Sequence, residues 1–395
     1  NMRVTVGGPD CKQPYSLSLL NISAMSFGSL SKNAILALSR GAKKDNFAHN
    51  TGEGGLSPYH LDGGGDLIWQ VGTGYFACRG DDGKFSPEIF KEKSAIPNVK
   101  MIEIKLSQGA KPGHGGILPA AKVTPEIAKI RGVPMGQDVL SPPTHNEFST
   151  PRGLLEFVKK LRDLSGGKPV GFKLCVGKRR EFLAICKAMV ETGITPDFIT
   201  VDGGEGGTGA APLEFSNHIG APLVEGLIFV HNALTGYSLR DKIKIIASGK
   251  ATSGFGLLKR LAIGADAVSS ARAMMMALGC IQALKCNSNH CPVGVATQMK
   301  HLVAGLDPTD KANRVASYHH ETINSLAEMI GALGLDSAEE LRPWHVMHRI
   351  SSNQTKHYGE LYNFLRGGEL LADELPPEYA RACASASAET FGHKE

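Results

Sequence analysis

Aromatic side chains are scarce in this sequence, at 6% of its 395 residues, and no long run of lysine and arginine occurs. Nucleic-acid-binding domains combine basic patches with aromatic side chains that stack on bases, so this class of function is not expected. The formal net charge is a mild +5. This small positive balance favours an anionic cofactor or a small acidic ligand.

A dense disulfide framework, a signal peptide and a membrane span are also missing from the sequence. Its eight cysteines are spread along the chain, which argues against a small secreted domain and predicts a reducing, cytoplasmic location. The most apolar stretch, residues 257–284, is interrupted by four charged side chains, so we expect no transmembrane helix there. A membrane anchor preceding Asn1 stays compatible with the sequence.

Glycine, in contrast, is abundant, with 47 residues, many of them in clusters that follow predicted strands. Clustered glycines make tight loops in which the backbone approaches a ligand closely. We predict strands over 17–24, 47–50, 99–106, 170–176, 198–201, 244–247 and 267–269. About eight strand–loop–helix units over roughly 270 residues indicate a (β/α)8 TIM barrel, in which active sites lie at the carboxyl ends of the strands.

The barrel is predicted to span residues 17–308, with an insertion over residues 56–97. A lead-in, residues 1–16, precedes it. A helical extension over residues 309–371 and a polar tail over residues 372–395 follow it.

Three cysteines, Cys280, Cys286 and Cys291, fall within twelve residues, and a proline follows the last of them. Their C-x5-C-x4-C spacing is wider than the close pairs of a structural zinc site. Iron–sulfur clusters are often held by cysteine runs that end in Cys-Pro, so the three thiols predict a [3Fe–4S] cluster. Three core cysteines without a metal are the alternative that the residues leave open.

A flavin phosphate is expected near Gly249, the segment 264–267 and Arg272. Barrels bind phosphate at the loops after their seventh and eighth strands, where Arg272 would add a permanently charged partner. Lys173 lies inside an apolar strand, and a lysine in a barrel mouth needs an anion, such as the negative charge of a reduced flavin. A surface position is the alternative for both side chains.

Lys105, Gln108, Lys111 and Arg131 form a polar and cationic set on the predicted third strand, 99–106, and its loop. Two cations can each hold one carboxylate and an amide adds direction, so the set predicts a dicarboxylate substrate. A solvated surface is the alternative for Lys111 and Arg131.

Two glutamates, Glu53 and Glu205, each stand between glycines, which suits close approach to a ligand and equally a surface turn. His114, His145 and His290 are weaker candidates for proton transfer, because a single histidine in a loop is more often polar surface.

Six ordered motifs between about residues 20 and 300, together with the cysteine spacing, resemble the FMN-binding synthase domain of glutamate synthase. The motifs are Ser26-Phe27-Gly28, Asn50-Thr51-Gly52-Glu53-Gly54-Gly55, Gln108-Gly109-Ala110-Lys111-Pro112-Gly113, Ser141-Pro142-Pro143, Gly206-Gly207-Thr208-Gly209-Ala210 and Cys291-Pro292-Val293-Gly294-Val295-Ala296-Thr297-Gln298.

This resemblance implies a (β/α)8 barrel with FMN and a [3Fe–4S] cluster. Such a domain passes electrons from the cluster to FMN and reduces 2-iminoglutarate, formed from 2-oxoglutarate and ammonia, to L-glutamate. The resemblance implies the three cysteines as cluster ligands, Glu53 and Lys111 as catalytic residues, and Gln108, Lys111 and Arg131 as contacts of 2-oxoglutarate. The implied FMN contacts are Met25, Ser26, Gln108, Lys173, Glu205, Gly206, Gly207, Gly249 and Arg272.

Four positions depart from the family motifs. The family's Gln-Leu-Pro is Ile117-Leu118-Pro119 here, so one amide that would contact the substrate is missing. His114 replaces a loop glutamate, Glu205 begins a motif that starts with aspartate in the family, and Ser248-Gly249-Lys250 replaces Asp-Gly-Gly. We therefore expect weak binding of 2-oxoglutarate, and tighter binding after Ile117→Gln.

The family's glutaminase, β-helix and nicotinamide domains are not in this sequence. We therefore expect ammonia as free ammonium or from a separate glutaminase subunit that releases it from glutamine. Electrons are expected from a ferredoxin or an NAD(P)H-oxidising subunit. Two alternatives stay open: an FMN and iron–sulfur electron-relay or regulatory subunit, and an oxidoreductase for a different keto or imino acid.

Overall fold

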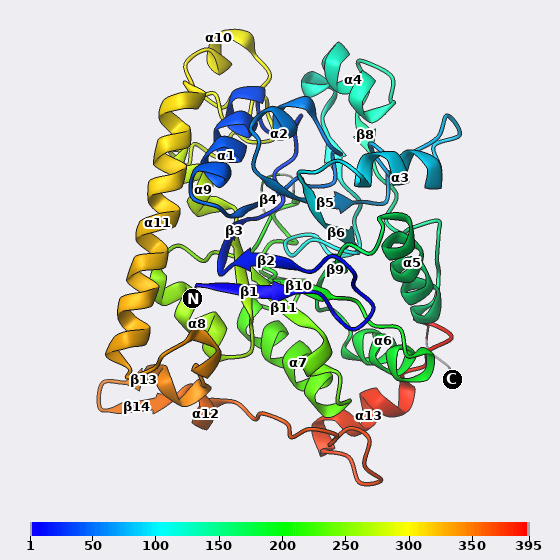
Figure 1. Ribbon diagram of the computed structural model, residues 1–395, viewed down its shortest axis with the longest axis vertical. Coiled ribbons are helices and arrows are strands. Elements are labelled where there is room, and N and C mark those ends of the chain that lie inside the picture. Colours follow the sequence, from blue (N-terminus) through cyan, green and yellow to red (C-terminus); the bar gives the residue numbers. More distant parts are fainter. Residues whose placement is uncertain (1, 208, 210, 393–395) are drawn as a thin grey trace.

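Eight parallel strands close into a barrel within the residues that the computed structural model describes, 2–207, 209 and 211–392 (Figure 1). In order around the barrel they are β3 (Leu20–Ile22), β4 (Ala48–Asn50), β5 (Asp66–Val71), β6 (Val99–Lys105), β9 (Val170–Cys175), β10 (Phe198–Asp202), β11 (Lys244–Ser248) and β12 (Ala267–Ser270). Val268 of the last strand pairs with Leu20 of the first, which closes the sheet. The predicted (β/α)8 TIM barrel is confirmed.

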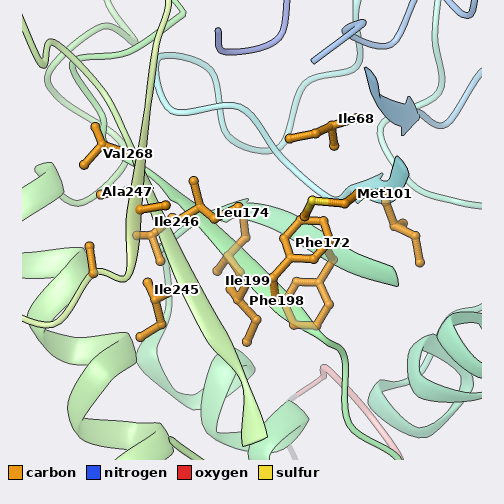
Figure 2. Packing of buried hydrophobic residues seen from close by; sticks show 14 of the residues in the cluster. Ile68, Met101, Phe172, Leu174, Phe198, Ile199, Ile245, Ile246, Ala247 and Val268 are labelled. Atoms are coloured by element: carbon orange, nitrogen blue, oxygen red, sulfur yellow. The ribbon is translucent and has the colours of Figure 1, made fainter. Parts of the chain in front are cut away.

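The barrel strands are buried on both faces, because helices cover their outside and packed side chains fill their inside. Every residue of β9 and β10 is buried. Figure 2 shows part of this core, in which Phe172 and Phe198 come from neighbouring strands and Ile68, Met101 and Ile246 from three others. The packed core fixes the strand ends and therefore the start of each loop that follows them.

Several outer helices begin at a serine or threonine N-cap residue. Ser31, Thr150 and Ser253 each accept a hydrogen bond from the backbone N–H three residues later. The helices over the barrel region are α1 (Lys32–Lys44), α2 (Pro58–Asp62), α3 (Pro87–Ser94), α5 (Pro151–Leu164), α6 (Arg179–Thr192), α7 (Leu223–Gly236), η3 (Arg240–Lys242), α8 (Gly254–Ala262), α9 (Arg272–Ala277) and α10 (Lys300–Val303).

The predicted insertion over residues 56–97 is wrong in part, because it contains β5, the third barrel strand. The strand predicted as the third, now β6, is therefore the fourth. β5 is buried from Leu67 to Val71, so it lacks the alternation of a half-exposed strand. The helix before it, α2, has only five residues and ends at a run of three glycines. The sequence therefore does not show the usual alternation of a strand with a long helix at this point.

A long excursion from the barrel lies between β6 and β9. It contains β7 (Ile117–Leu118), η1 (Ala120–Lys122), α4 (Pro125–Arg131) and β8 (Val139–Leu140). The strands β7 and β8 pair antiparallel outside the barrel. Because this excursion follows the carboxyl end of β6, it belongs to the face where barrel active sites lie.

The N-terminal segment closes the opposite face of the barrel. β1 (Arg3–Val6) and β2 (Tyr15–Ser18) form an antiparallel hairpin. Its turn donates from Gly8 N to Asp197 Oδ1 at 2.7 Å, just before β10. The single strand predicted over residues 17–24 is therefore wrong, because β2 ends at Ser18 and β3 begins at Leu20.

After the barrel, α11 (Pro308–Ala332) runs along α1 and α8 (Figure 1). It is followed by η4 (Ala338–Glu340), η5 (Pro343–His345), β13 (Met347–Ser351), β14 (Gln354–His357), α12 (Tyr358–Leu361) and α13 (Pro377–Ser385). The predicted helical extension thus includes a β-hairpin, and α13 packs on α6. Among the described residues, no helix combines the length and apolarity needed to cross a membrane.

Candidate active site

Four ionisable side chains meet at the carboxyl ends of β4 and β6. Glu53 lies on the loop after β4, and its Oε1 is 2.7 Å from Nζ of Lys105, the last residue of β6. Lys105 Nζ also donates to Gln108 Oε1 at 3.3 Å. Lys111 and Arg131, from the excursion after β6, are 1% and 4% exposed and act on the charge of Glu53. The structure thus brings the predicted cationic set together around one carboxylate.

The electrostatics of this cluster keep Glu53 ionised. Burial alone would raise the pKa of its carboxyl, but Lys105, followed by Arg131 and Lys111, brings the net pKa below its usual value. The pKa of Lys111 is lowered by burial and by the Lys105 charge, while Glu53 opposes this. Lys111 Nζ donates to Gly115 O at 3.0 Å. The site therefore contains both an ionised carboxylate, that of Glu53, and an ammonium group with a lowered pKa, that of Lys111.

Arg131 reaches the cluster from the end of α4. Its Nη2 donates to Phe27 O at 3.1 Å, and its guanidinium lies 5.1 Å from the centroid of the Phe76 ring. A Cβ at Gly28 or Gly54 would lie 3.1 or 2.7 Å from Nη2, so these glycines make room for it. No described residue accepts a hydrogen bond from its buried Nε, and burial, opposed by Glu53, lowers its pKa to about 10. The guanidinium therefore has spare capacity for an anion.

A narrow cavity opens beside the cluster, lined in part by Glu53 and His114. A neighbouring cavity of about 300 Å³ shares Thr73 and Pro142 with it. Ile117 is 41% exposed and, within the described part of the chain, lines neither of these cavities. The residues directly before it, Gly115 and Gly116, do line the narrow cavity, and a Cβ at Gly116 would lie 2.1 Å from Glu53 Oε1. The Ile117 side chain itself therefore lies outside the lining, at its edge.

The loops after β6 and β10 pack so closely that Gly109 and Gly207 have no room for a side chain. A Cβ at Gly109 would lie 1.8 Å from Gly203 O, and one at Gly207 would lie 2.5 Å from Gln108 Nε2. The Gln108 amide donates to Gly207 O, and Ala110 N donates to Gly206 O at 2.6 Å. These contacts hold the two glycine-rich loops together, and we call this backbone arrangement the glycine cradle.

The loops after β11 and β12 extend this cradle. Gly249 has a φ of 141°, a conformation that favours glycine. Arg272 is half-buried and begins α9, directly after β12. Thr208 and Ala210 of the glycine motif lie outside the described residues.

Lys173 points into the barrel mouth, as the sequence predicts for a lysine that meets an anion. Its Nζ lies 3.0 Å from Asp202 Oδ2, and the two side chains are 7% and 3% exposed. Burial opposes the charge, but Asp202 and then Glu103 leave the pKa of Lys173 raised. Asp202 Oδ2 also accepts from Gly109 N at 3.0 Å. The pair therefore ties β9 and β10 to the glycine cradle.

Three other predicted FMN contacts take part in local bonds. Met25 is buried after β3, and its carbonyl lies 3.1 Å from Nε2 of His60. Ser26 Oγ donates to Ser29 Oγ at 2.9 Å. Glu205 accepts from the N–H of Leu223 at 3.1 Å and so caps α7.

The histidine candidates differ in their surroundings. His145 is buried between Tyr75 Oη, at 3.0 Å from Nδ1, and Lys105 O, at 2.8 Å from Nε2. Burial lowers its pKa to about 4, so it is neutral near pH 7 and supports the end of β6. His114 packs edge-on against Phe215 with its ring centroid at 4.6 Å, and His290 is exposed.

The cysteine loop folds back on itself after α9. Gln282, Leu284 and Asn289 have φ values of 56°, 54° and 65°, which is costly for residues other than glycine and is typical of functional loops. Burial raises the pKa of Cys286, and the charges of Cys280 and Cys291 raise it further. All three are free.

This donor set is all sulfur. Gln282 N donates to Cys280 Sγ at 3.4 Å, the kind of amide–sulfur bond that tunes iron–sulfur clusters. No group of three or more histidine, cysteine or acidic side chains among the described residues could hold a single metal ion. A polynuclear cluster binds its thiolates at separate irons, so it does not require the three sulfurs to meet at one point.

Comparison with known proteins identifies the family. Residues 9–336 match the family described as the conserved region in glutamate synthase. This chain belongs to the glutamate synthase family. The Bacillus subtilis glutamate synthase large subunit-like protein YerD is 44% identical over 346 residues, which cover 87% of this chain and 66% of YerD. The archaeal glutamate synthase [NADPH] of Methanocaldococcus jannaschii is 37% identical over 81% of this chain and 60% of its own length.

These glutamate synthase relatives are longer than the matched region, since this chain spans two thirds of their length or less. Among solved structures, the flavin-binding domain of Baker's yeast flavocytochrome b2 has a TM-score of 0.51 at 15% identity, over 86% of this chain and 72% of that one. At this identity the likeness supports the barrel fold alone. All predicted site residues of this glutamate synthase family member lie within the matched region, residues 9–336.

Sequence reasoning missed several buried polar residues of this site. Glu103, 1% exposed, accepts hydrogen bonds from Asn50 at 2.8 Å, Gln70 at 2.6 Å and Thr200 at 2.6 Å inside the barrel. A charged residue within an apolar strand was the available signal, as it was for Lys173. Asp202 was also not predicted, because its role depends on its ion pair with Lys173 of the neighbouring strand.

Proposed function

We propose that this chain is a flavin and iron–sulfur oxidoreductase that reduces 2-iminoglutarate, formed from 2-oxoglutarate and ammonia, to L-glutamate. Membership of the glutamate synthase family and relatives named archaeal glutamate synthase [NADPH] support this reaction class. The single observation that carries the substrate assignment is the buried charge cluster around Glu53.

The cluster has an excess of positive charge that a dicarboxylate would neutralise. Lys105, Lys111 and Arg131 carry three positive charges and Glu53 one negative charge, which leaves +2. Lys173 and Asp202 cancel each other, and Glu103, which accepts hydrogen bonds from Asn50, Gln70 and Thr200 further inside the barrel, is outside this sum. Buried charge is costly unless it is compensated, so a keto dicarboxylate with two negative charges suits the cavity better than a monocarboxylate.

The cradle and the cysteine loop provide the groups that the two cofactors need. FMN would be held by Met25, Ser26, Gln108, Lys173, Glu205, Gly206, Gly207, Gly249 and Arg272. A [3Fe–4S] cluster would be held by Cys280, Cys286 and Cys291, and their sulfur-only donor set, with the amide bond to Cys280 Sγ, supports the assignment. When bound, the cluster supplies single electrons and FMN supplies hydride.

The chain's own residues hold the substrate and its protons. Lys111 and Arg131 would each hold one carboxylate, and the Gln108 amide would fix the direction of the substrate. Because the pKa of Lys111 is lowered, its Nζ gives up a proton more readily than an ordinary lysine and can protonate the imine nitrogen. Glu53 stays ionised and can hold ammonium or the product amine.

Ammonia and electrons would come from outside this region. Free ammonium or a glutaminase subunit would supply the nitrogen. A ferredoxin or an NAD(P)H-oxidising subunit would supply the electrons, in line with the [NADPH] in the names of the archaeal relatives.

The test is a single-turnover reaction of the reconstituted protein. Its visible spectrum is recorded first, and the anaerobically reduced protein is then mixed with 2-oxoglutarate and ammonium. We expect flavin absorbance that returns on mixing, no return without ammonium, and little return when pyruvate replaces 2-oxoglutarate. A protein that carries both cofactors but does not respond to 2-oxoglutarate and ammonium would contradict the substrate and favour the relay alternative. A colourless reconstituted protein would contradict both.

A further inference from the structure

Lys122 joins the cysteine loop to the loop that follows β3. It is the last residue of η1, and its side chain is only 2% exposed. Its Nζ donates to Ser29 O at 2.8 Å and to Cys286 O at 2.6 Å. One ammonium group therefore links the excursion after β6, the loop after β3 and the predicted cluster loop.

The link is reciprocal. Asn289, in the cysteine loop, donates from Nδ2 to Ala121 O at 2.9 Å, so each segment uses a side chain to bind the other's backbone. Gln298 adds bonds from Nε2 to Gly28 O at 3.0 Å and to Leu30 O at 2.9 Å. The cysteine loop is thus fixed at the junction of the segments that carry Ser26 and Arg131.

The charge of Lys122 has no carboxylate partner among the described residues. None of the ion pairs between them includes it, and both acceptors of its Nζ are backbone carbonyls. The buried Lys105 and Lys173 have carboxylate partners, while Lys111 and Lys168 also donate to backbone carbonyls. Lys122 differs from these four lysines because it donates to the cysteine loop. A buried cation is costly without a counter-charge, so this lysine is suited to a site where the thiolates are permanently ionised, as they are when bound to iron.

We propose that Lys122 is a positioning residue for the iron–sulfur cluster: it holds the Cys286 backbone in place and supplies the buried positive charge that sets the reduction potential of the cluster. This inference rests on the proposed function, because it presumes that the three cysteines bind the cluster. Reduction adds an electron to the cluster, and a nearby buried cation stabilises that added charge. Loss of the cation should therefore weaken iron retention and move the potential to more negative values.

The experiment compares Lys122→Met, Lys122→Gln and Lys122→Arg with the wild type after anaerobic reconstitution with iron and sulfide. Lys285→Met is the matched control, since Lys285 adjoins Cys286 but is exposed. Lys129→Met, an exposed lysine of the same excursion, is a second control. Iron loss to a chelator is timed, and the midpoint potential is measured by a redox titration followed by electron paramagnetic resonance.

We expect Lys122→Met to lose iron about tenfold faster or more, the effect typical of groups that orient metal ligands. We expect Lys122→Met and Lys122→Gln to shift the potential to more negative values, because both remove the charge. Lys122→Arg should restore most of the potential, and both controls should match the wild type. If Lys122→Met does not fold, Lys122→Gln, which keeps an N–H donor, carries the potential measurement.

An unchanged potential in the neutral variants would overturn the proposal, even if iron loss is faster, because a purely structural lysine would alter retention alone. Equal shifts in Lys285→Met would also overturn it, since any nearby charge would then suffice. Failure of the wild type to take up iron and sulfide is a different outcome. It would contradict the cluster assignment in the proposed function.

Discussion

The substitution Arg131→Met should strengthen the ligand-free fold while weakening substrate binding. The guanidinium is buried, its Nε has no acceptor among the described residues, and burial lowers its pKa to about 10. Each unit by which the pKa is lowered corresponds to about 1.4 kcal/mol, so burial destabilises the charged guanidinium by about 3 kcal/mol. Methionine removes this cost and fills similar space.

The methionine sulfur can keep a contact with the Phe76 ring, so one interaction is lost in exchange. The bond from Arg131 to Phe27 O disappears, and a carbonyl left without a donor costs about 1–2 kcal/mol. The net effect is a gain of about 1 kcal/mol in the free energy of unfolding. With an unfolding entropy of about 2.1 cal/mol/K per residue, a chain of this length gains about 1 °C in Tm.

Binding should change in the opposite direction. A charge-assisted hydrogen bond to a carboxylate contributes about 1.5–3 kcal/mol, so its loss should weaken 2-oxoglutarate binding about 10- to 150-fold. Calorimetry of the ligand-free protein gives Tm, and a 2-oxoglutarate titration followed by flavin absorbance gives Kd.

Arg162→Met is the matched control, because Arg162 is equally buried but is paired with Asp197 at 2.9 Å. It should lower stability by about 3–5 kcal/mol, since it leaves Asp197 uncompensated, without altering Kd in the folded protein. The reasoning is refuted if Arg131→Met destabilises the protein as Arg162→Met does while Kd stays at the wild-type value.

Four further predictions follow from the same contacts. Cys286→Ser should abolish the cluster, because three thiolates leave no spare ligand; wild-type iron and sulfide content in the purified variant would contradict this. Lys173→Ala should lower the free energy of unfolding by about 3–5 kcal/mol and weaken flavin retention, because Asp202 loses its buried partner. Adding Asp202→Asn should restore the stability but not the flavin retention, as measured by denaturation and by flavin release. Ile117→Gln should change 2-oxoglutarate affinity by no more than about twofold, since the Ile117 side chain is 41% exposed and lines neither cavity, and a clear tightening would restore the role expected from its motif. Burial lowers the pKa of His60 to about 4, so the unfolded state binds a proton at a higher pH than the folded state does. The free energy of unfolding should therefore fall as the pH drops from about 6.5 to 4. His60→Gln should flatten that part of the stability–pH curve.

The barrel could be predicted from the sequence because most of its strands carry their own signals. Apolar runs that lead into glycine-rich loops mark β6 and β10, and the N-cap residues Ser86 and Thr150 mark the helices that precede β6 and β9. β5 was not predicted as a barrel strand, because a five-residue helix precedes it and it lies among other short apolar runs. The hairpin of β1 and β2 was missed because its pairing depends on contacts with the far strands of the barrel, such as that of Gly8 with Asp197.

The candidate site could be predicted where one residue is anomalous in its own segment. Lys173 in an apolar strand and Glu53 between glycines are such cases, and the structure places both at the barrel mouth. Lys122 was not predicted, because a lysine in a loop is ordinary and its burial arises only when two distant segments fold against it. Asp202 escaped for the same reason, since its partner lies on the neighbouring strand.

The central claim is that the cavity around Glu53 joins ammonia to 2-oxoglutarate. The most direct test gives the reduced, reconstituted protein isotopically labelled ammonium and 2-oxoglutarate, and follows the product by nitrogen-15 NMR. We predict L-glutamate labelled at the amino nitrogen, with a strongly reduced yield in Glu53→Gln and Lys111→Met and an unchanged yield in Lys129→Met. Absence of labelled glutamate from a protein that contains both flavin and cluster would contradict the account.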